Sequence, residues 1–327
     1  MAEFDEVTGG LKVGAAVLGD IDNLGALARL PGKWTGTGRG WNMIALPVDA
    51  ANADGERFKF RLLLNQFDET LEFTTHVLGV PNRGNPDDQT INGLKYTQDV
   101  VQQIAIDSMG STISPTGSAG IHHEPGFFLR LLNQFHNDAQ GRAMDIARLG
   151  TIPHGDAVAA IGSAFDVPGP TDISLATGAI GDFSALPLGA GPRDLSNPYL
   201  APYKMFHDAP FKGTVTAPGF PGFDPTDPLA LLGLGSGTPF KSMTVIILDT
   251  ANSGGITNLP FVVEQANATS MRFVMWIEEL EGSTPEAPKF QLQYAQRVML
   301  EFFPAFGNPS SLIQWPHISI NTLQLTT

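Results

Sequence analysis

The chain has 327 residues, of which 42% are hydrophobic and 16% are charged, and its formal net charge is −14. With only 19 Lys and Arg, it lacks the basic surface that phosphates or anionic lipids attract, so we expect no nucleic-acid partner and no membrane. The absence of cysteine excludes disulfides, thiolate catalysis and Cys-ligated metal centres. The acidic N-terminus does not resemble a secretory signal, and no apolar run approaches ~20 residues, so we expect a cytoplasmic protein.

The N-terminal part of the chain gives one firm strand prediction. Residues 1–29 are acidic and then mildly apolar, which suggests a short helix or arm. From Trp34 to Leu46, small residues alternate with Trp, Thr and Arg, as in a strongly bent barrel strand. The glycine spacing of this segment is also compatible with a phosphate loop, but no helical pattern follows it, so we reject that reading.

Alternation of apolar and polar residues predicts further strands along the whole chain. In the first half they cover Arg57 to Leu64, Leu71 to Val80, Leu94 to Ile106, Gly120 to Leu132 and, as strand–turn–strand, Ala147 to Phe165. In the second half they cover Met243 to Thr250, Pro260 to Glu264, Met271 to Leu280, Phe290 to Phe303 and Leu312 to Leu325. Met271 to Leu280 has a composition that a short helix could share, but its β-branched and aromatic residues favour a strand.

A weak internal repeat and one segment of unusual composition suggest two halves. Leu94–Val100 (LKYTQDV) resembles Leu292–Val298 (LQYAQRV), and each copy is followed by a Pro-His pair. Residues 166–203 are rich in Pro, Gly, Asp and Ser, which is typical of a crossover. We therefore predict an all-β chain with two β-barrels, residues 1–200 with the N-terminal arm and the crossover, and a degenerate second barrel over residues 201–327. A single large sandwich is the alternative.

Histidines are the main candidates for metal or heme ligands in a chain without cysteine. The supply is His76, His122, His123, His136, His154, His207 and His317. His122 and His123 are adjacent, so on a strand they point to opposite faces and only one can enter a cavity. His154 stands between a proline and a glycine, and His317 begins an alternating strand. For each of them alone, a polar side chain that bonds a backbone carbonyl is the favoured reading.

Charged residues near these histidines suggest supporting roles. Glu124 follows the histidine pair and could orient an imidazole, or it could cap a turn. Arg130 and Arg148 could each pair with the propionates of a bound macrocycle, or face solvent. We find no G-x-S-x-G elbow, H-E-x-x-H, Walker A or EF-hand motif, so hydrolase, zinc-protease, nucleotide and calcium sites are not indicated.

Several segments resemble one family, the bacterial and fungal heme-binding β-barrel proteins, which are similar in shape to nitrobindins and fatty-acid-binding barrels. The resemblance is carried by Trp34-Thr35-Gly36, Ile121–Phe128 (IHHEPGFF), Ile152–Gly155 (IPHG), Asn197–Leu200 (NPYL), Gln291–Gln296 (QLQYAQ) and Trp315-Pro316-His317. It implies lipocalin- or nitrobindin-like barrels, heme b as cofactor and a peroxidase-like activity. By position, His122 and His154 resemble the family's histidines.

These observations lead to a hypothesis for the site. We expect one heme, with His154 as the iron ligand, His122 as the alternative and His317 as a third choice. The other member of the His122/His154 pair would move protons during reaction with peroxide and small electron donors, and Arg148 would stabilise developing charge.

Three other functions remain open: a carrier of fatty acids or similar apolar small molecules without heme, a non-heme iron oxygenase that uses His122, His154 and a carboxylate, and a structural interaction protein. The oxygenase lacks the expected H-x-H spacing of cupins. A homodimer and a monomer are both compatible with the sequence.

Overall fold

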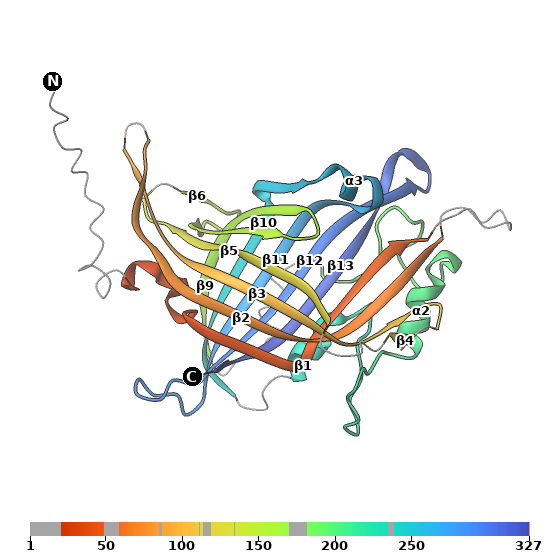
Figure 1. Ribbon diagram of the computed structural model, residues 1–327, viewed down its shortest axis with the longest axis horizontal. Helices are drawn as coiled ribbons and strands as arrows, with labels where there is room; N and C mark the ends of the chain where they lie inside the picture. The colour runs from red at the N-terminus through yellow and green to blue at the C-terminus, as the bar shows by residue number, and fades with distance from the viewer. Residues whose placement is uncertain are drawn as a thin grey trace.

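Long antiparallel strands pair in chain order, and the last pairs back with the first, which closes the sheet into a ten-stranded barrel (Figure 1). The computed structural model describes residues 21–48, 59–84, 87–110, 112–113, 119–133, 135–169, 182–234 and 239–326. The barrel strands are β1 (Gly32–Pro47), β2 (Phe60–Asn82), β3 (Gln89–Asp107), β5 (Ala119–Leu131), β8 (Ile146–Ile152), β9 (Asp156–Pro168), β10 (Phe240–Asn258), β11 (Asn267–Leu280), β12 (Phe290–Ala305) and β13 (Asn308–Thr326). The short strands are β4 (Thr112–Ile113), β6 (His136–Asn137) and β7 (Ala143–Met144).

The prediction of two barrels is wrong. β9 pairs with β10 and β13 pairs with β1, so residues on both sides of position 200 belong to one closed sheet. The Pro/Gly-rich crossover leaves the barrel at β9 and returns to the neighbouring strand β10. It is therefore an insertion between two paired strands and does not connect two barrels. Closure gives each barrel strand two neighbouring strands, which reduces the exposed sheet edge available for edge-to-edge aggregation.

The internal repeat lies within this one barrel. Its two copies fall on β3 and β12, and Tyr96 and Tyr294 are both buried in its interior. The repeat therefore marks two strands with equivalent inward-facing positions, which the sequence pattern alone could not distinguish from two separate domains.

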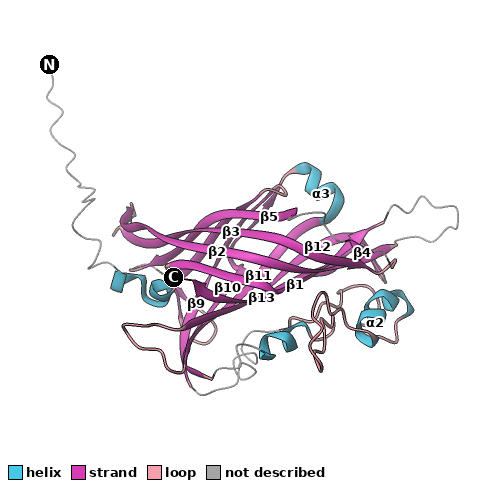
Figure 2. Ribbon diagram, turned by 60° about the horizontal axis from the view of Figure 1, so that its bottom comes forward, coloured by secondary structure: helices cyan, strands magenta, loops and turns pink. Residues whose placement is uncertain are grey.

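The insertion between β9 and β10 covers one outer side of the barrel (Figure 2). It contains η2 (Pro198–Leu200), α2 (Ala201–Asp208) and η3 (Pro228–Leu234). Tyr203, Phe206 and Phe223 of this segment are buried in one apolar cluster with outward-facing side chains such as Met43 and Trp276. The strands beneath it are thus buried on both faces, which explains the nearly unbroken apolar run of β11.

The helix η1 (Ile21–Arg29) closes one end of the barrel. Its Leu24, Leu27 and the following Leu30 are fully buried among interior aromatic residues, and Trp34 Nε1 donates to the Leu30 carbonyl at 2.8 Å. The expected short helix before the first strand is confirmed for these residues. Residues 1–20 of the predicted arm lie outside the described part of the chain.

The predicted strand at the glycine-rich start of β1 is confirmed, and it contains a bulge. The pairing of β1 with β2 shifts register between Gly36 and Gly40. The Phe67 ring of β2 occupies the space that a β-carbon at Gly40 would need. Bulges of this kind bend a strand where a barrel curves, so these glycines shape the barrel wall.

Most other predicted strands are confirmed, with two differences. Arg57 to Leu64 and Leu71 to Val80 were expected as two strands, but β2 runs from Phe60 to Asn82 without a break. Pro260 to Glu264 was expected as a strand and forms the helix α3 (Pro260–Ala266), which starts with proline at its first turn. In the part of the chain that the structure describes, no helix is long and apolar enough to span a membrane.

Candidate functional site

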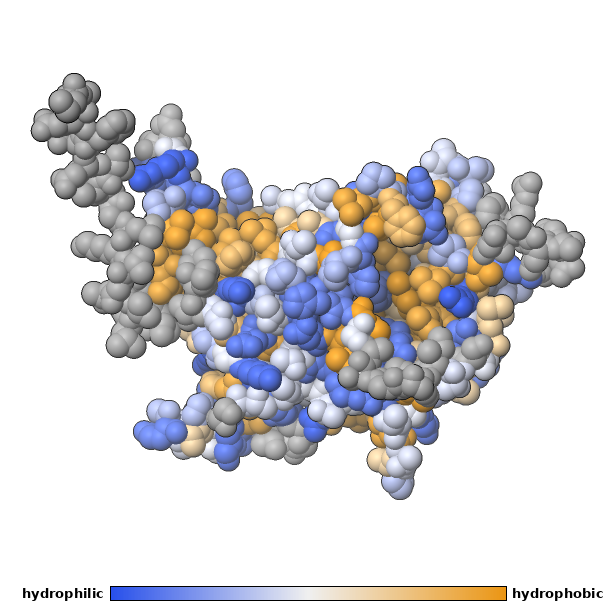
Figure 3. Space-filling model, in the orientation of Figure 1, coloured by the Kyte–Doolittle hydropathy of each residue, from blue (hydrophilic) through white to orange (hydrophobic). Residues whose placement is uncertain are grey.

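A cavity of about 300 Å³ lies inside the barrel at the end opposite η1. Its lining comes from the barrel strands β1, β2, β3, β5, β12 and β13 and from the β8–β9 turn, near the strand ends that carry α3 and the β12–β13 turn. The lining residues are Asn42, Ile44, Leu46, Leu63, Asn65, Phe67, Gln98, Val100, Gln102, Ile121, His122, His154, Tyr294, Gln296, His317 and Ser319. The walls therefore combine aliphatic side chains with amides and imidazoles. On the face shown in Figure 3, hydrophobic residues gather in a hollow on the side where Figure 1 places α3.

Three of the predicted site histidines meet at this cavity. His122 comes from β5, His154 from the β8–β9 turn and His317 from β13. The ring centroids of His122 and His154 are 5.5 Å apart. His123 points to the opposite face of β5, where its Nδ1 lies 2.6 Å from Asp99 Oδ1 on the exposed surface. The prediction that only one member of the histidine pair enters a cavity is thus confirmed.

The approach of His122 and His154 follows from the way β5 and β8 separate. Their ladder ends at the pair Gly126 and Gly150, whereas β5 continues towards Ala119 and β8 turns back into β9. The two histidines lie where these strands diverge. Burial and the nearby His122 lower the pKa of His154, although Asp156 and a hydrogen bond with the backbone of Ile121 act in the opposite direction.

Glu124 and Arg148 form a buried ion pair next to the cavity. Arg148 Nη2 donates to Glu124 Oε1 at 2.7 Å, and the Tyr96 hydroxyl donates to the same oxygen. The other carboxylate oxygen lies 3.2 Å from His122 Nε2. Burial alone would raise the pKa of Glu124, but Arg148 and the hydrogen bonds outweigh burial and hold the pKa at about 2. Glu124 is therefore ionised at neutral pH and orients the His122 ring.

Both predicted arginines are engaged within the protein. Arg148 also donates to Gln296 Oε1 at 2.8 Å and lies over the Phe273 ring, and it does not line the cavity. Arg130 lies at the η1 end, where its Nε is 3.3 Å from Asp145 Oδ2. Arg130 therefore has no contact with the histidine-lined cavity, and Arg148 acts on it only through Glu124 and Gln296.

A second buried carboxylate, Glu69, was not anticipated from the sequence. Its oxygens accept hydrogen bonds of 2.7 Å each from Gln98 Nε2, the Tyr294 hydroxyl and Asn321 Nδ2. Burial raises the pKa of Glu69, and these donors act in the opposite direction. The signal in the sequence was an acidic residue placed between Phe67 and Leu71 on the inward face of an alternating strand.

His317 lies inside the barrel with part of its ring exposed to the cavity. Burial, together with His122 and His154, lowers the pKa of His317 to about 4, so its imidazole is neutral at pH 7. No other described residue forms a hydrogen bond with this ring. A neutral imidazole that is not engaged in a hydrogen bond can coordinate a metal ion through its unprotonated ring nitrogen.

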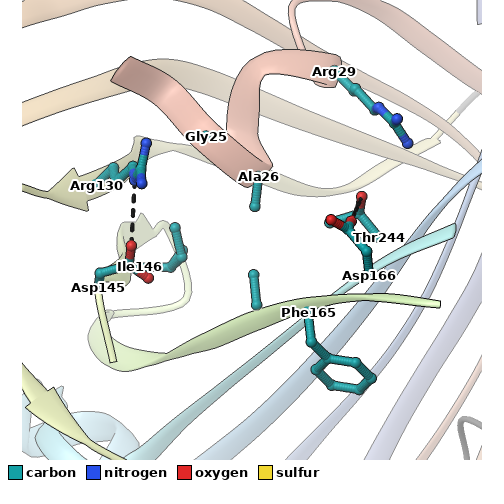
Figure 4. A pocket seen from close by; sticks show the side chains of 10 residues that line it. Gly25, Ala26, Arg29, Arg130, Asp145, Ile146, Phe165, Asp166 and Thr244 are labelled. Carbon is teal, nitrogen blue, oxygen red and sulfur yellow. Dashed lines mark hydrogen bonds and ion pairs between the residues drawn. The ribbon is translucent and has the colours of Figure 1, made fainter. Parts of the chain in front are cut away.

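A second hollow of about 340 Å³ lies beneath η1 at the closed end (Figure 4). Its charges are already compensated within the protein. Arg130 pairs with Asp145, Thr244 Oγ1 donates to Asp166 Oδ1 at 2.6 Å, and Arg29 lies 3.7 Å from Glu279. The cavity that holds the three histidines is therefore the better candidate for a functional site.

The fold and the site define the class of protein: a closed ten-stranded antiparallel β-barrel with a histidine-lined internal cavity. Comparison of the chain with protein-family models, with curated proteins and with solved structures gives no match. The argument for function therefore rests on the geometry of the cavity and on the sequence motifs.

Proposed function

We propose that the protein binds one heme in the cavity, with a nitrogen of His317 as the iron ligand. The observation that carries this proposal is the state of the His317 ring, which is neutral, lies inside the barrel and has no hydrogen-bond partner among the described residues. A ligand imidazole has to be unprotonated and accessible, and both conditions are met here.

The other two histidines are less suitable as iron ligands. His122 Nε2 is directed at Glu124 Oε2, so one ring nitrogen is engaged with a carboxylate. His154 lies in an exposed turn and forms a hydrogen bond with the backbone of Ile121. This ranking reverses the order inferred from the sequence, because only the structure shows which ring is free.

The cavity can enclose only part of a porphyrin, and the residues that line it suit the apolar part of that ligand. A cavity of about 300 Å³ is at the lower end of ordinary ligand sites, and a porphyrin would fill it and extend into the mouth. Leu63, Phe67 and Val100 would contact its apolar faces. No Lys or Arg is among the lining residues of the described chain, so the propionates would have to lie in the solvent-exposed mouth.

The resemblance to peroxidase-like barrels extends the proposal to catalysis. Bound heme would supply the activation of peroxide. The chain's own contribution is His122: with Nε2–H donated to Glu124, its Nδ1 remains an acceptor that can take up and return a proton. Arg148 keeps Glu124 ionised and so holds this tautomer in place.

Two alternatives are less well supported by the geometry. A fatty-acid carrier would need a cation to meet the carboxylate, and none lines the cavity in the described part of the chain. A non-heme iron site would need two histidines and a carboxylate around one point, and the described residues contain no such group of three.

The test is a titration of the purified protein with hemin, followed by absorbance in the Soret region. We expect saturation at one heme per chain and a spectrum distinct from that of free hemin. Addition of peroxide and a chromogenic donor then measures activity against the same amount of free hemin. An unchanged hemin spectrum would refute heme binding, and a rate no better than that of free hemin would refute the enzymatic part alone.

A further inference from the structure

The repeat on β3 and β12 places two glutamines, Gln98 and Gln296, at the cavity. Each follows a buried tyrosine by two residues, so the four side chains share the inward face of the barrel. A glutamine amide can present either its oxygen or its nitrogen, and its neighbours decide which. In this barrel the deciding neighbours are the Glu69 carboxyl group, which also accepts from Tyr294 and Asn321, and the Arg148 guanidinium.

Glu69 fixes the orientation of Gln98. Gln98 Nε2 donates to Glu69 Oε1 at 2.7 Å and lies 3.5 Å from the Tyr294 hydroxyl. A carboxylate accepts hydrogen bonds, so the reversed amide would set oxygen against oxygen. Gln98 Oε1 is consequently turned away from Glu69 and has no partner among the described residues.

Arg148 fixes Gln296 in the opposite sense. Arg148 Nη1 donates to Gln296 Oε1 at 2.8 Å, and a guanidinium cannot accept. Gln296 Nε2 consequently has no hydrogen-bond partner among the residues that the structure describes. Neither Gln98 Oε1 nor Gln296 Nε2 is among the buried atoms that lack a partner, and both residues line the cavity. The cavity lining thus offers one hydrogen-bond acceptor, Gln98 Oε1, and one donor, Gln296 Nε2. Their orientations are fixed by hydrogen bonds to Glu69 and Arg148.

We propose that these two glutamines form a recognition site for a small molecule with an apolar body and a carboxamide head. The carboxamide N–H would donate to Gln98 Oε1, and its carbonyl would accept from Gln296 Nε2. The apolar body would pack on the aliphatic and aromatic walls formed by Ile44, Leu46, Leu63, Phe67 and Val100. A carboxylate would face the Gln98 oxygen with no donor to offer, so an acid is a poorer ligand than its amide.

This inference does not depend on heme, because the atoms that carry it are all in the protein. The probe is benzamide, compared with N,N-dimethylbenzamide, which lacks the donor, and with benzoate, which is an anion. Binding to the full-length protein is measured by calorimetry at neutral pH. We expect benzamide to bind at least about tenfold more tightly than either analogue, the difference that loss of one buried hydrogen bond produces.

Variants locate the site. Gln98→Met and Gln296→Met should each weaken benzamide binding about tenfold, whereas Gln102→Met, on the same strand and wall as Gln98, should change it less than twofold. Failure of benzamide to bind, equal affinity for the three compounds, or equal loss in Gln102→Met would overturn the proposal. The comparison of ligands on the unmodified protein remains decisive if a variant does not fold. Both ligands would contact Leu63, Phe67 and Val100, so hemin absorbance is recorded on separate samples without benzamide and reports on the heme proposal alone.

Discussion

The Glu124 carboxylate packs directly on Gly150, in the space that a β-carbon at position 150 would occupy. The Tyr96 hydroxyl reaches the same place. Glu124 and Gly150 lie near the end of the β5–β8 ladder, where the two strands begin to separate towards His122 and His154. A glycine at this point is thus a condition for the buried ion pair that orients His122.

Replacement of this glycine should therefore be costly. We expect Gly150→Ala to lower the free energy of unfolding by about 2 kcal/mol or more, because the new methyl group displaces Glu124 and Tyr96 from their hydrogen bonds. Thermal or urea unfolding measures the loss. Gly120→Ala on the same strand as Glu124 is the matched control, because nothing lies within 4 Å of a β-carbon at that position. Equal stability of the two variants would contradict the assignment.

The buried ion pair should also govern stability in acid. The pKa of Glu124 in the folded protein is about 2, below its usual value of 4.5, so the unfolded chain takes up the proton first. The stabilisation is complete above pH 4.5 and is lost as the pH falls towards 2, and the difference amounts to roughly 3 kcal/mol. Denaturant unfolding at several pH values measures this slope. In Glu124→Gln the slope over this range should be smaller, and an unchanged slope would show that another group is responsible.

The last strand should be essential to the barrel. β13 pairs with both β12 and β1, and its Trp315, Ile318 and Leu323 are fully buried. Deletion of residues 312–327 would open the sheet and expose two long edges. We expect an unfolded or aggregated product by circular dichroism and size-exclusion chromatography. A soluble, equally stable protein would contradict a closed barrel.

The sequence predicted most strands because one face of each lies in the barrel interior and the other often meets solvent. It failed on the number of barrels, since closure depends on the pairing of β1 with β13, whose residues are far apart in the chain. It also gave a strand at Pro260 to Glu264, where a short apolar segment forms a connecting helix. Periodicity over so few residues does not distinguish the two.

For the site, the sequence indicated which residue types to consider, but it did not show how their side chains are arranged. The absence of cysteine directed attention to His122, His154 and His317, and all three line one cavity. Their ranking as ligands depends on which ring is already bonded, and that depends on Glu124 and the turn at Ile121. Glu69 was overlooked because its partners come from three other strands.

The most direct test of the account is the ligand assignment for heme. Hemin is titrated into the wild-type protein and into His317→Ala, His154→Ala and His122→Ala, with Soret absorbance as readout and far-ultraviolet circular dichroism to verify the fold. We predict that only His317→Ala loses the protein-bound spectrum or weakens hemin binding at least about tenfold, while the other two variants bind hemin nearly as well as wild type. A folded His317→Ala protein with an unchanged heme spectrum would contradict the proposed role of this cavity.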